Sequence, residues 1–586
     1  MMVCPTSQAW LRSLCAGLLA MVLASVQTGA DAQTSPQKSS GAASAPAIVA
    51  PTPLRVQLLW SHQAQFAGFY MAQARKYFEA EGLAVELVEG GESINPIVEL
   101  QAGRVDLAVS WMSNAWSRSS VQDPVVNVAQ LFSGTFLAVV CRTSAGIRTP
   151  RELLGQRIGV WGLGDEVIVQ EMLRRLDVPI ESVSLHTQRP AAQDLISGEL
   201  PCATAMTYNE YWHLLAAGFS PEDLVLFSPE DLGVFRMEDG LYARADRLES
   251  PEFRDQVLRL TRALRRGWMS AKQEPTLALQ MVLRQAPASD RDHQRHMLET
   301  LLAALPPEQR FGYFDLRRFE QVAQTLKQYS GHVQPEHPLW THAVWNALWP
   351  QRVLNSATAY QVQRVFESPL WAGLVLFGTL AFAFSAALRA IECGYGLWGR
   401  LLIAMTASMG GGAIRDLLIG GARLPFYFMS DASYPVGIFL IVMASSWWVK
   451  PPSAPGQAMP LARIRQWCET LGFALIAVNG AMVALMAQLA WFWAPFCAAI
   501  SCTGGGLLQD VLMNREPSAF RGKLFEETAM VTALSLLAVL LVANRFEHSM
   551  LPVVLSFLMA LGVAVVLQWW IGLSKPRLPA WMAHRA

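Results

Sequence analysis

Hydrophobic and polar positions divide the chain of 586 residues into two unlike parts. Over residues 53–331, short apolar runs alternate with amphipathic stretches, and charged residues are frequent. After Pro369, apolar runs long enough to cross a bilayer follow one another with few charges between them. The pattern predicts a soluble domain over 53–331, a connector over 332–368, a membrane domain over 369–573 and a tail over 574–586.

The soluble part alternates predicted strands with predicted helices. The first set has strands at 54–60, 84–88 and 105–109, with helices at 66–81 and 96–102. Repeated strand–helix units predict parallel sheets with ligands at the carboxyl ends of the strands. A second set has strands at 156–161, 182–186 and 203–207. Two α/β lobes, the second over about 141–228, predict a domain that closes on a ligand.

The amino terminus has the pattern of a secretory signal over residues 1–32. Arg12 precedes an apolar run at 14–26, and Ala30-Asp31-Ala32 has the form of a cleavage site. A first anchor helix is the alternative. Residues 33–52, rich in Ser, Ala, Gln and Pro, are typical of a linker. Export would place Cys141 and Cys202 in an oxidising compartment, either as a disulfide or as two buried thiols.

Seven apolar segments follow in the membrane part. They lie near 370–388, 397–419, 434–449, 471–489, 492–513, 527–543 and 551–571. With the binding domain exported, seven spans place the C-terminus in the cytoplasm and the protein in a bacterial inner membrane. Lys and Arg crowd the predicted cytoplasmic segments, and only Arg415, Arg423 and Arg545 fall on periplasmic ones. That asymmetry is the one expected for this orientation.

The membrane part contains a repeat. Gly410, Gly411, Gly412, Arg415 and Asp416 recur 94 residues later as Gly504, Gly505, Gly506, Gln509 and Asp510. Three spans per repeat is an odd number, so the two halves are expected to be inverted, with a seventh helix after them.

We interpret these ten residues as the candidate pore. Glycine inside a helix costs about 1 kcal/mol relative to alanine, so the triplets predict broken or kinked helices facing a cavity. Close helix packing is the alternative. Arg415 and Asp416 are expected to face the bundle interior, with an anchoring role at the outer interface as the alternative.

Candidate ligand contacts in the soluble part favour a flat heteroaromatic ring. Aromatic faces at strand ends can sandwich a ring, a glycine turn can present backbone N–H groups, and a carboxylate can accept from an exocyclic amine. Core positions, a plain turn and a solvated helix face are the respective alternatives. The predicted set is Trp60, Gln65, Phe66, Tyr70, Gly90, Gly91, Ser93, Trp111, Asn114, Trp161, Tyr208, Asn209 and Glu210.

The run from Trp60 to Ala72 (WSHQAQFAGFYMA), with GRVD at 103–106 and MTYNEY at 206–211, resembles periplasmic binding proteins for thiamine pyrimidine precursors. The resemblance covers about 54–329 and implies a type II periplasmic binding protein with an aminopyrimidine-like ligand. The superfamily also includes sulfonate and nitrate binders. Eukaryotic precursor synthases of this fold carry a cysteine-rich motif that this chain lacks. We therefore expect no enzyme, no cofactor and no metal site.

The segment 370–573, carried by the two G-G-G-x-x-[RQ]-D motifs, resembles the prokaryotic trimeric intracellular cation (TRIC) channels, also grouped under a glycine-transporter domain name. FSAALRA at 384–390 and the REP turn at 515–517 support it. The resemblance implies a homotrimer with one pore per subunit for monovalent cations such as potassium. Gln509 stands where the family commonly has arginine, which removes one pore charge.

Three functional hypotheses follow. The binding domain captures an aminopyrimidine-like solute while the membrane domain mediates uptake of a small solute or cation; or it senses a ligand and gates a potassium channel; or it is tethered to serve a separate ABC permease. The last needs another protein for ATP, since the chain has no G-x-x-x-x-G-K-[ST] motif. With 46 basic and 46 acidic residues, the composition gives no sign of a nucleic-acid partner.

Overall fold

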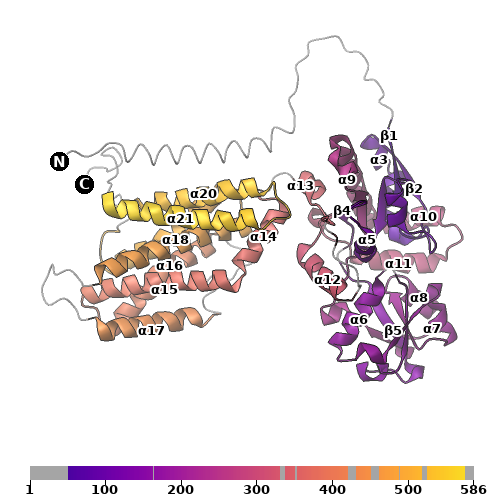
Figure 1. Cartoon of the computed structure of the whole chain (residues 1–586), viewed down its shortest axis with the longest axis horizontal. Coiled ribbons are helices and arrows are strands. Elements are labelled where there is room, and N and C mark those ends of the chain that lie inside the picture. Colours follow the sequence, from indigo (N-terminus) through magenta and orange to yellow (C-terminus); the bar gives the residue numbers. More distant parts are fainter. Residues whose placement is uncertain are drawn as a thin grey trace, which may run out of the picture. The chain divides into compact units, whose positions relative to one another are not determined.

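The computed structural model describes residues 51–132, 134–162, 164–329, 335, 337–349, 353–419, 431–449, 461–487, 489–517 and 524–574. The predicted signal peptide, and the linker up to residue 50, lie outside them, as does the tail from residue 575. The chain divides into two compact units, one ending at Trp349 and the other running from Pro350 to the end. Figure 1 shows an α/β unit and an all-helical unit.

The first lobe is built on a five-stranded sheet in the order β2-β1-β3-β10-β4. Strand β1 (Thr52–Gln57) pairs in parallel with β2 (Leu83–Val88) and β3 (Leu107–Ser110). Strand β10 (Gly240–Arg244) returns from the other lobe and pairs antiparallel with β3 and with β4 (Val125–Gln130). Lobe one therefore contains segments from both sides of lobe two in the sequence.

Helix α2 (Ala67–Ala74) and the long α9 (Pro251–Gln273) pack against each other in lobe one. The predicted helix over 66–81 is two helices, α2 and α3 (Tyr77–Ala80), separated at Lys76, whose φ of 54° breaks the helix. A Cβ on Gly267 would lie 2.1 Å from the Gly68 carbonyl oxygen. Glycine therefore sets how closely the two helices approach.

The second lobe has a sheet in the order β7-β6-β8-β5-β9. Strand β6 (Arg157–Val160) pairs in parallel with β7 (Ser184–Thr187) and β8 (Cys202–Met206). Strand β5 (Leu137–Arg142) lies antiparallel between β8 and β9 (Leu224–Phe227). Cys141 and Cys202 face each other across β5 and β8 and form a disulfide. Of the two alternatives for this pair, the structure shows the disulfide.

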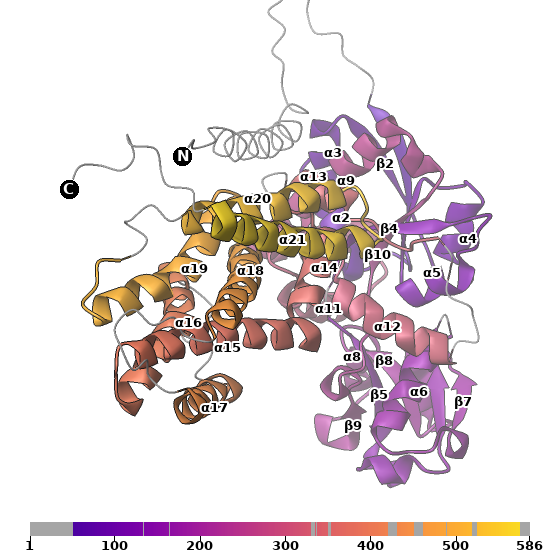
Figure 2. The ribbon, with the colours of Figure 1, turned by 60° about the vertical axis from the view of Figure 1, so that its left-hand side comes forward.

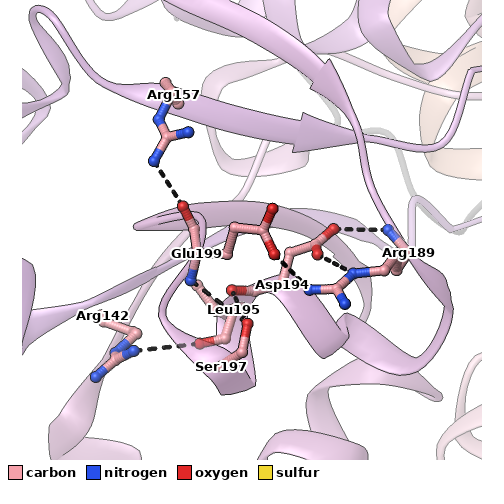
Figure 3. Close-up of polar contacts among 7 residues, drawn as sticks. All are labelled: Arg142, Arg157, Arg189, Asp194, Leu195, Ser197 and Glu199. Atoms are coloured by element: carbon pink, nitrogen blue, oxygen red, sulfur yellow. Dashed lines mark hydrogen bonds and ion pairs between the residues drawn. The ribbon is translucent and has the colours of Figure 1, made fainter.

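A polar cluster holds α7 (Gln193–Ser197) on lobe two (Figure 3). Arg189 pairs with Asp194 and with Glu199, and Arg157 donates to the Glu199 carbonyl oxygen at 2.6 Å. Arginine and carboxylate are both partly exposed in the Arg189–Glu199 pair, so that contact adds little stability. The cluster fixes the loop that leads from β7 to α7.

The tryptophan-rich start of the connector packs on lobe one. Trp340 forms a β-bridge with Asn127, and α13 (Ala343–Leu348) lies on α9 with Trp345 buried. The Arg265 guanidinium lies 5.0 Å from the centroid of the Trp349 ring. The tryptophans of this segment therefore form a cap on the binding unit.

The second unit begins with α14 (Ser356–Phe366), and further helices occupy each of the seven predicted apolar segments (Figure 2). Five of the described helices are long and apolar enough to cross a membrane. They are α15 (Pro369–Glu392), α16 (Leu397–Ile419), α18 (Ala462–Met486), α20 (Phe525–Ala543) and α21 (Leu551–Ser574). Helix α17 (Ser433–Trp448) is shorter, and α19 (Trp493–Leu512) is not among the five.

Candidate functional site

A cavity of about 220 Å³ lies between the two lobes of the binding unit. Trp60 follows β1 in lobe one, and Trp161 follows β6 in lobe two. Their rings meet edge to face, with centroids 6.2 Å apart. The lining residues are Leu59, Trp60, Gln63, Gln65, Glu92, Trp111, Trp161, Thr187, Gln188, Met206, Tyr208, Asn209 and Glu210. The cleft therefore draws aromatic side chains from both lobes.

Seven of the predicted contacts line this cavity: Trp60, Gln65, Trp111, Trp161, Tyr208, Asn209 and Glu210. The others do not. Phe66 and Tyr70 are buried in the core of lobe one, and the Tyr70 hydroxyl lies 2.9 Å from the His62 Nδ1. Phe66 ends η1 (Ala64–Phe66) and Tyr70 lies in α2, and both side chains pack inward.

The remaining predicted contacts serve the scaffold of lobe one. Asn114 is buried and exchanges hydrogen bonds with Asn95, at 2.9 and 3.0 Å. A Cβ on Gly90 would lie 2.3 Å from the Leu58 carbonyl oxygen, so this glycine permits a close backbone contact. Gly91 and Ser93 are in the same loop and are not among the residues that line the cavity.

Six lining residues were not predicted: Leu59, Gln63, Glu92, Thr187, Gln188 and Met206. Thr187 ends β7, and Gln188 follows it at the carboxyl edge of the lobe-two sheet. The strand-end argument that selected Trp161 applies equally to them. Gln188 also bonds the Thr204 backbone in both directions, at 2.8 and 3.1 Å, which joins β7 to β8 beneath the cavity.

Buried carboxylates surround the cleft. Glu210 accepts from the Met206 backbone N–H at 2.8 Å and from the Asn209 amide at 2.7 Å, and burial raises its pKa to about 7. Asp239 lies behind the wall, accepts from Gln65 at 2.7 Å and from the Trp111 indole at 3.1 Å, and burial raises its pKa to about 7. These acceptors hold three lining side chains in place: Gln65, Trp111 and Asn209.

The charge of the lining is acidic. Glu92 and Glu210 are its carboxylic acids, and no lysine, arginine or histidine is among the cavity residues that the structure describes. The Arg236 guanidinium is buried 3.7 Å from the centroid of the Trp111 ring. Such a wall suits a flat ring that donates N–H groups. No group of three or more metal-ligating side chains occurs in the described part of the chain.

In the helical unit, the glycine triplets mark the crossing of α16 and α19. A Cβ on Gly411 would lie 2.3 Å from the Ser501 carbonyl oxygen, and one on Gly505 would lie 2.2 Å from the Ala407 carbonyl oxygen. Ser501 follows Ala407 by the same 94 residues that separate the glycines. Each repeat therefore contacts the other in the same way.

The expected breaks at the triplets are absent. Helices α16 and α19 both run without interruption through their glycines. Gly410 and Gly504 also face the opposite helix, whereas a Cβ on Gly506 would meet nothing within 4 Å. The prediction of broken helices was wrong, because the missing side chains make room for a neighbouring backbone rather than for a bend.

Two cavities lie beside this crossing. One, of about 20 Å³, is lined by Val375, Thr379, Ser408, Met409, Gly412, Arg415, Tyr434, Ile476 and Asn479. The other, of about 90 Å³, is lined by Phe382, Ser385, Ala386, Arg389, Ala407, Glu469, Phe473, Cys502, Thr503, Gly506, Leu507, Gln509, Phe525 and Glu526. Every residue that lines the first cavity, except Tyr434, has a counterpart 94 residues away in the lining of the second. The counterparts of Ile476 and Asn479 lie 94 residues earlier in the chain, and the others lie 94 residues later. The two cavities are therefore equivalent positions of the repeat.

The polar groups of the two cavities differ. Arg415 is buried, bonds Asp416 at 2.8 Å and donates to the Ser501 hydroxyl at 3.1 Å. Both charged side chains are therefore buried among the helices of the unit. Gln509 occupies the place of Arg415 in the larger cavity, whose ion pair is instead Arg389 with Glu469. Asp510 is half-buried and does not line either cavity.

Comparisons with known proteins agree with this division. A family model described as NMT1/THI5 like matches residues 63–278. A model described as glycine transporter matches twice, at 373–450 and 466–544. A UPF0126 membrane protein of Deinococcus radiodurans is 30% identical over 209 residues, which are 35% of this chain and 92% of that protein. The chain belongs to the UPF0126 membrane proteins.

The UPF0126 half also matches a solved TRIC channel orthologue from Rhodobacter sphaeroides, at 22% identity over 36% of this chain and all of that one, with a TM-score of 0.31. The soluble half is 28% identical over 133 residues to a formylaminopyrimidine-binding protein of Halalkalibacterium halodurans. That match covers 22% of this chain and only 40% of the relative. An NMT1/THI5-like domain is thus joined to a TRIC-like UPF0126 domain.

Proposed function

We propose that this chain is a membrane-anchored periplasmic binding protein whose cleft holds an aminopyrimidine-like thiamine precursor, joined to a pore for a monovalent cation such as potassium. The observation that carries the proposal is the interlobe cavity, in which Trp60 and Trp161 from opposite lobes lie beside the Glu210 carboxylate. A pyrimidine ring in the cavity packs against such aromatic walls, and its exocyclic amine donates to the carboxylate.

The ligand class follows from charge as well as shape. A sulfonate or nitrate needs donors or cations, and the described lining offers carboxylates instead. An aminopyrimidine presents N–H donors and a flat apolar face. The relative from Halalkalibacterium halodurans is a formylaminopyrimidine-binding protein, and its ligand belongs to the same chemical class. Both arguments support a pyrimidine over an oxyanion.

The pore proposal rests on the repeat. Reciprocal contacts at Gly411 and Gly505 are those of a two-fold axis between the halves. With three helices per half, such an axis is satisfied by inverted repeats of a seven-helix bundle, with α21 as the additional helix. Cavities of about 20 and 90 Å³ suit an ion with one or a few waters better than a pyrimidine ring. We therefore place the cation first, with uptake of a small solute second.

Orientation and assembly complete the proposal. The distribution of Lys and Arg favours a periplasmic binding unit and a cytoplasmic C-terminus in the inner membrane. The homotrimer comes from the TRIC resemblance. A separate ABC permease would be a partner only if the membrane half served as a tether.

A second candidate function is ligand gating. The connector is fixed at both ends, because α13 packs on the binding unit and Asn355 bonds Asn544 of the helical unit at 2.7 and 3.0 Å. Only residues 349–355 separate α13 from α14. A connection this short favours mechanical coupling over a loose tether.

The ligand proposal is tested by thermal shift of the full chain in detergent with formylaminopyrimidine, an alkanesulfonate and nitrate. Stabilisation by the pyrimidine alone is expected, since a ligand that binds the folded state raises its melting temperature. Trp161→Ala should weaken binding about tenfold or more, because it removes one aromatic wall of the cavity. Trp398→Ala, at an exposed position on α16, serves as the control. Stabilisation by sulfonate or nitrate alone would disprove the ligand class.

A further inference from the structure

Stacked rings join the two lobes beside the cleft. Helix α8 (Glu210–Ala216) belongs to lobe two and faces α11 (Arg291–Ala303), which packs in the core of lobe one. Trp212 stacks on His296 with centroids 3.9 Å apart, and His213 stacks on His293 at 4.1 Å. These rings form a contact between lobes at the end of α8 that also carries Glu210.

A chain of hydrogen bonds runs from this contact to the cavity wall. His293 Nε2 lies 2.9 Å from the Asn209 Oδ1, and an amide oxygen only accepts, so Nε2 carries the imidazole proton. The Asn209 amide nitrogen then donates to one Glu210 oxygen at 2.7 Å. The other Glu210 oxygen accepts from the Met206 backbone at 2.8 Å. A residue of lobe one thereby fixes a carboxylate of lobe two that lines the cleft.

We propose that His293 is a positioning residue of the cleft, which orients the Glu210 carboxylate for the ligand through Asn209 only when the two lobes are closed. His293 does not line the cavity itself and acts through Asn209. The choice of ligand in the test rests on the proposed function above. Closure of the lobes then also orients the Glu210 carboxylate that accepts from the ligand. Ligand affinity therefore depends on His293, a residue outside the cavity.

The imidazole of His293 is neutral in this contact. Burial lowers the pKa of His293 to about 4, with His213 and His296 acting in the same direction and Asp290 opposing them. Burial also lowers the pKa of His213. The other ionisable groups on the packed elements are Glu210 on α8, Arg284 on α10 (Pro275–Gln285), and Arg291, Asp292, Arg295 and Glu299 on α11; η1 has none.

A proton on His293 would weaken this contact. The Nδ1 atom of His293 is buried without a hydrogen-bond partner, so a proton there would find no acceptor and would place positive charge against His213. The chain to Glu210 would then lose its support. Ligand affinity should therefore fall in acid by more than the protonation of Glu210 alone explains.

The test compares two variants of the full chain. His293→Phe keeps a ring on His213 but has no donor, whereas His293→Gln keeps an N–H donor and cannot take a proton. Calorimetry with formylaminopyrimidine at pH 8 and pH 5 should show about tenfold weaker binding for His293→Phe at pH 8. His293→Gln should bind like the wild type at pH 8 and lose less affinity at pH 5. His186→Gln, an exposed histidine of β7, is the control.

Hydrogen exchange without ligand separates this inference from the proposed function. Residues 206–216 of His293→Phe should exchange faster than in the wild type, because the lobe contact has lost its hydrogen bond. If the wild type binds no pyrimidine, the proposed function fails and the exchange result still decides the role of His293. The inference would be overturned if His293→Phe and His293→Gln lost the same ligand affinity, or if His293→Phe bound the ligand like the wild type. Unchanged hydrogen exchange over residues 206–216 in His293→Phe would also overturn it.

Discussion

Individual buried carboxyl groups provide the hydrogen-bond acceptors in and around the cleft. Glu210 and Asp239 are almost fully buried and hydrogen-bonded to lining residues, and burial raises the pKa of each to about 7. Asp165 begins α6 (Asp165–Arg175), accepts from the Trp161 backbone at 2.9 Å, and has a pKa raised by the same cause. Their protonation in the folded protein changes near neutral pH, far from the range of an unfolded chain.

The pH dependence of stability follows from this difference. Between the ordinary carboxyl pKa of about 4 and the folded-state pKa of about 7, the folded protein still binds protons that the unfolded chain has lost, so the free energy of unfolding should fall as the pH rises toward 7 and level off above it. Asp239→Asn removes one such group and should flatten the slope. Melting temperatures of the full chain across this range measure it. Stability that rises with pH in the wild type would contradict the assignment.

The sequence predicts a cleft aromatic where a strand end identifies one, as at Trp60 and Trp161. It does not separate these from Phe66 and Tyr70, because a ring at the same turn packs inward or outward according to tertiary contacts. Asp239 could not be found, since it precedes the strand that returns from lobe two. Its position depends on a pairing between strands far apart in the chain.

At the level of elements, the crossing of α16 and α19 shows how one sequence signal admits two structures. A glycine triplet in an apolar helix is compatible with a break or with a close crossing. Which of the two structures forms depends on whether the backbone of another helix lies against the glycines. A single sequence does not show that tertiary contact. The 94-residue repeat could be read directly, and the reciprocal contact then gives its geometric meaning.

Alanine substitutions distinguish the glycines. Gly411→Ala and Gly505→Ala each place a Cβ within about 2.3 Å of a carbonyl oxygen, so the helices must separate, at a cost of about 1–3 kcal/mol. Gly506→Ala meets nothing within 4 Å and should be tolerated. Thermal unfolding in detergent and ion flux report both effects. Equal behaviour of Gly505→Ala and Gly506→Ala would argue against the close crossing.

For the whole molecule, the central question is whether the cleft and the membrane half act together. Both lie in one chain, and the connector is fixed on each unit by its own contacts. The sequence predicted both halves from their composition and motifs. The packing of the connector could not be predicted in the same way, because a stretch of tryptophans and prolines has no regular spacing that identifies its contacts.

Flux in proteoliposomes measures that coupling. Potassium flux through the full chain should change when formylaminopyrimidine is added on the side of the binding unit, because lobe closure pulls on a short connector. Trp161→Ala should abolish the change and leave the basal flux. Accumulation of the pyrimidine inside the proteoliposomes would instead identify the membrane half as a carrier of the ligand. Tight ligand binding without flux of either potassium or pyrimidine would indicate that the membrane half only tethers the binding unit.

The reciprocal contact at Gly411 and Gly505 restricts how the two copies of the repeat can diverge. Each glycine lies against the backbone of the other copy, so a substitution at either one alters the same contact between α16 and α19. Neither glycine can therefore be replaced without affecting both copies. Positions outside this helix contact are not restricted in this way. Arg415 in one copy and Gln509 in the other are a difference of this kind. The two copies thereby keep the same contact at these glycines, while the cavities beside it differ in their charged residues.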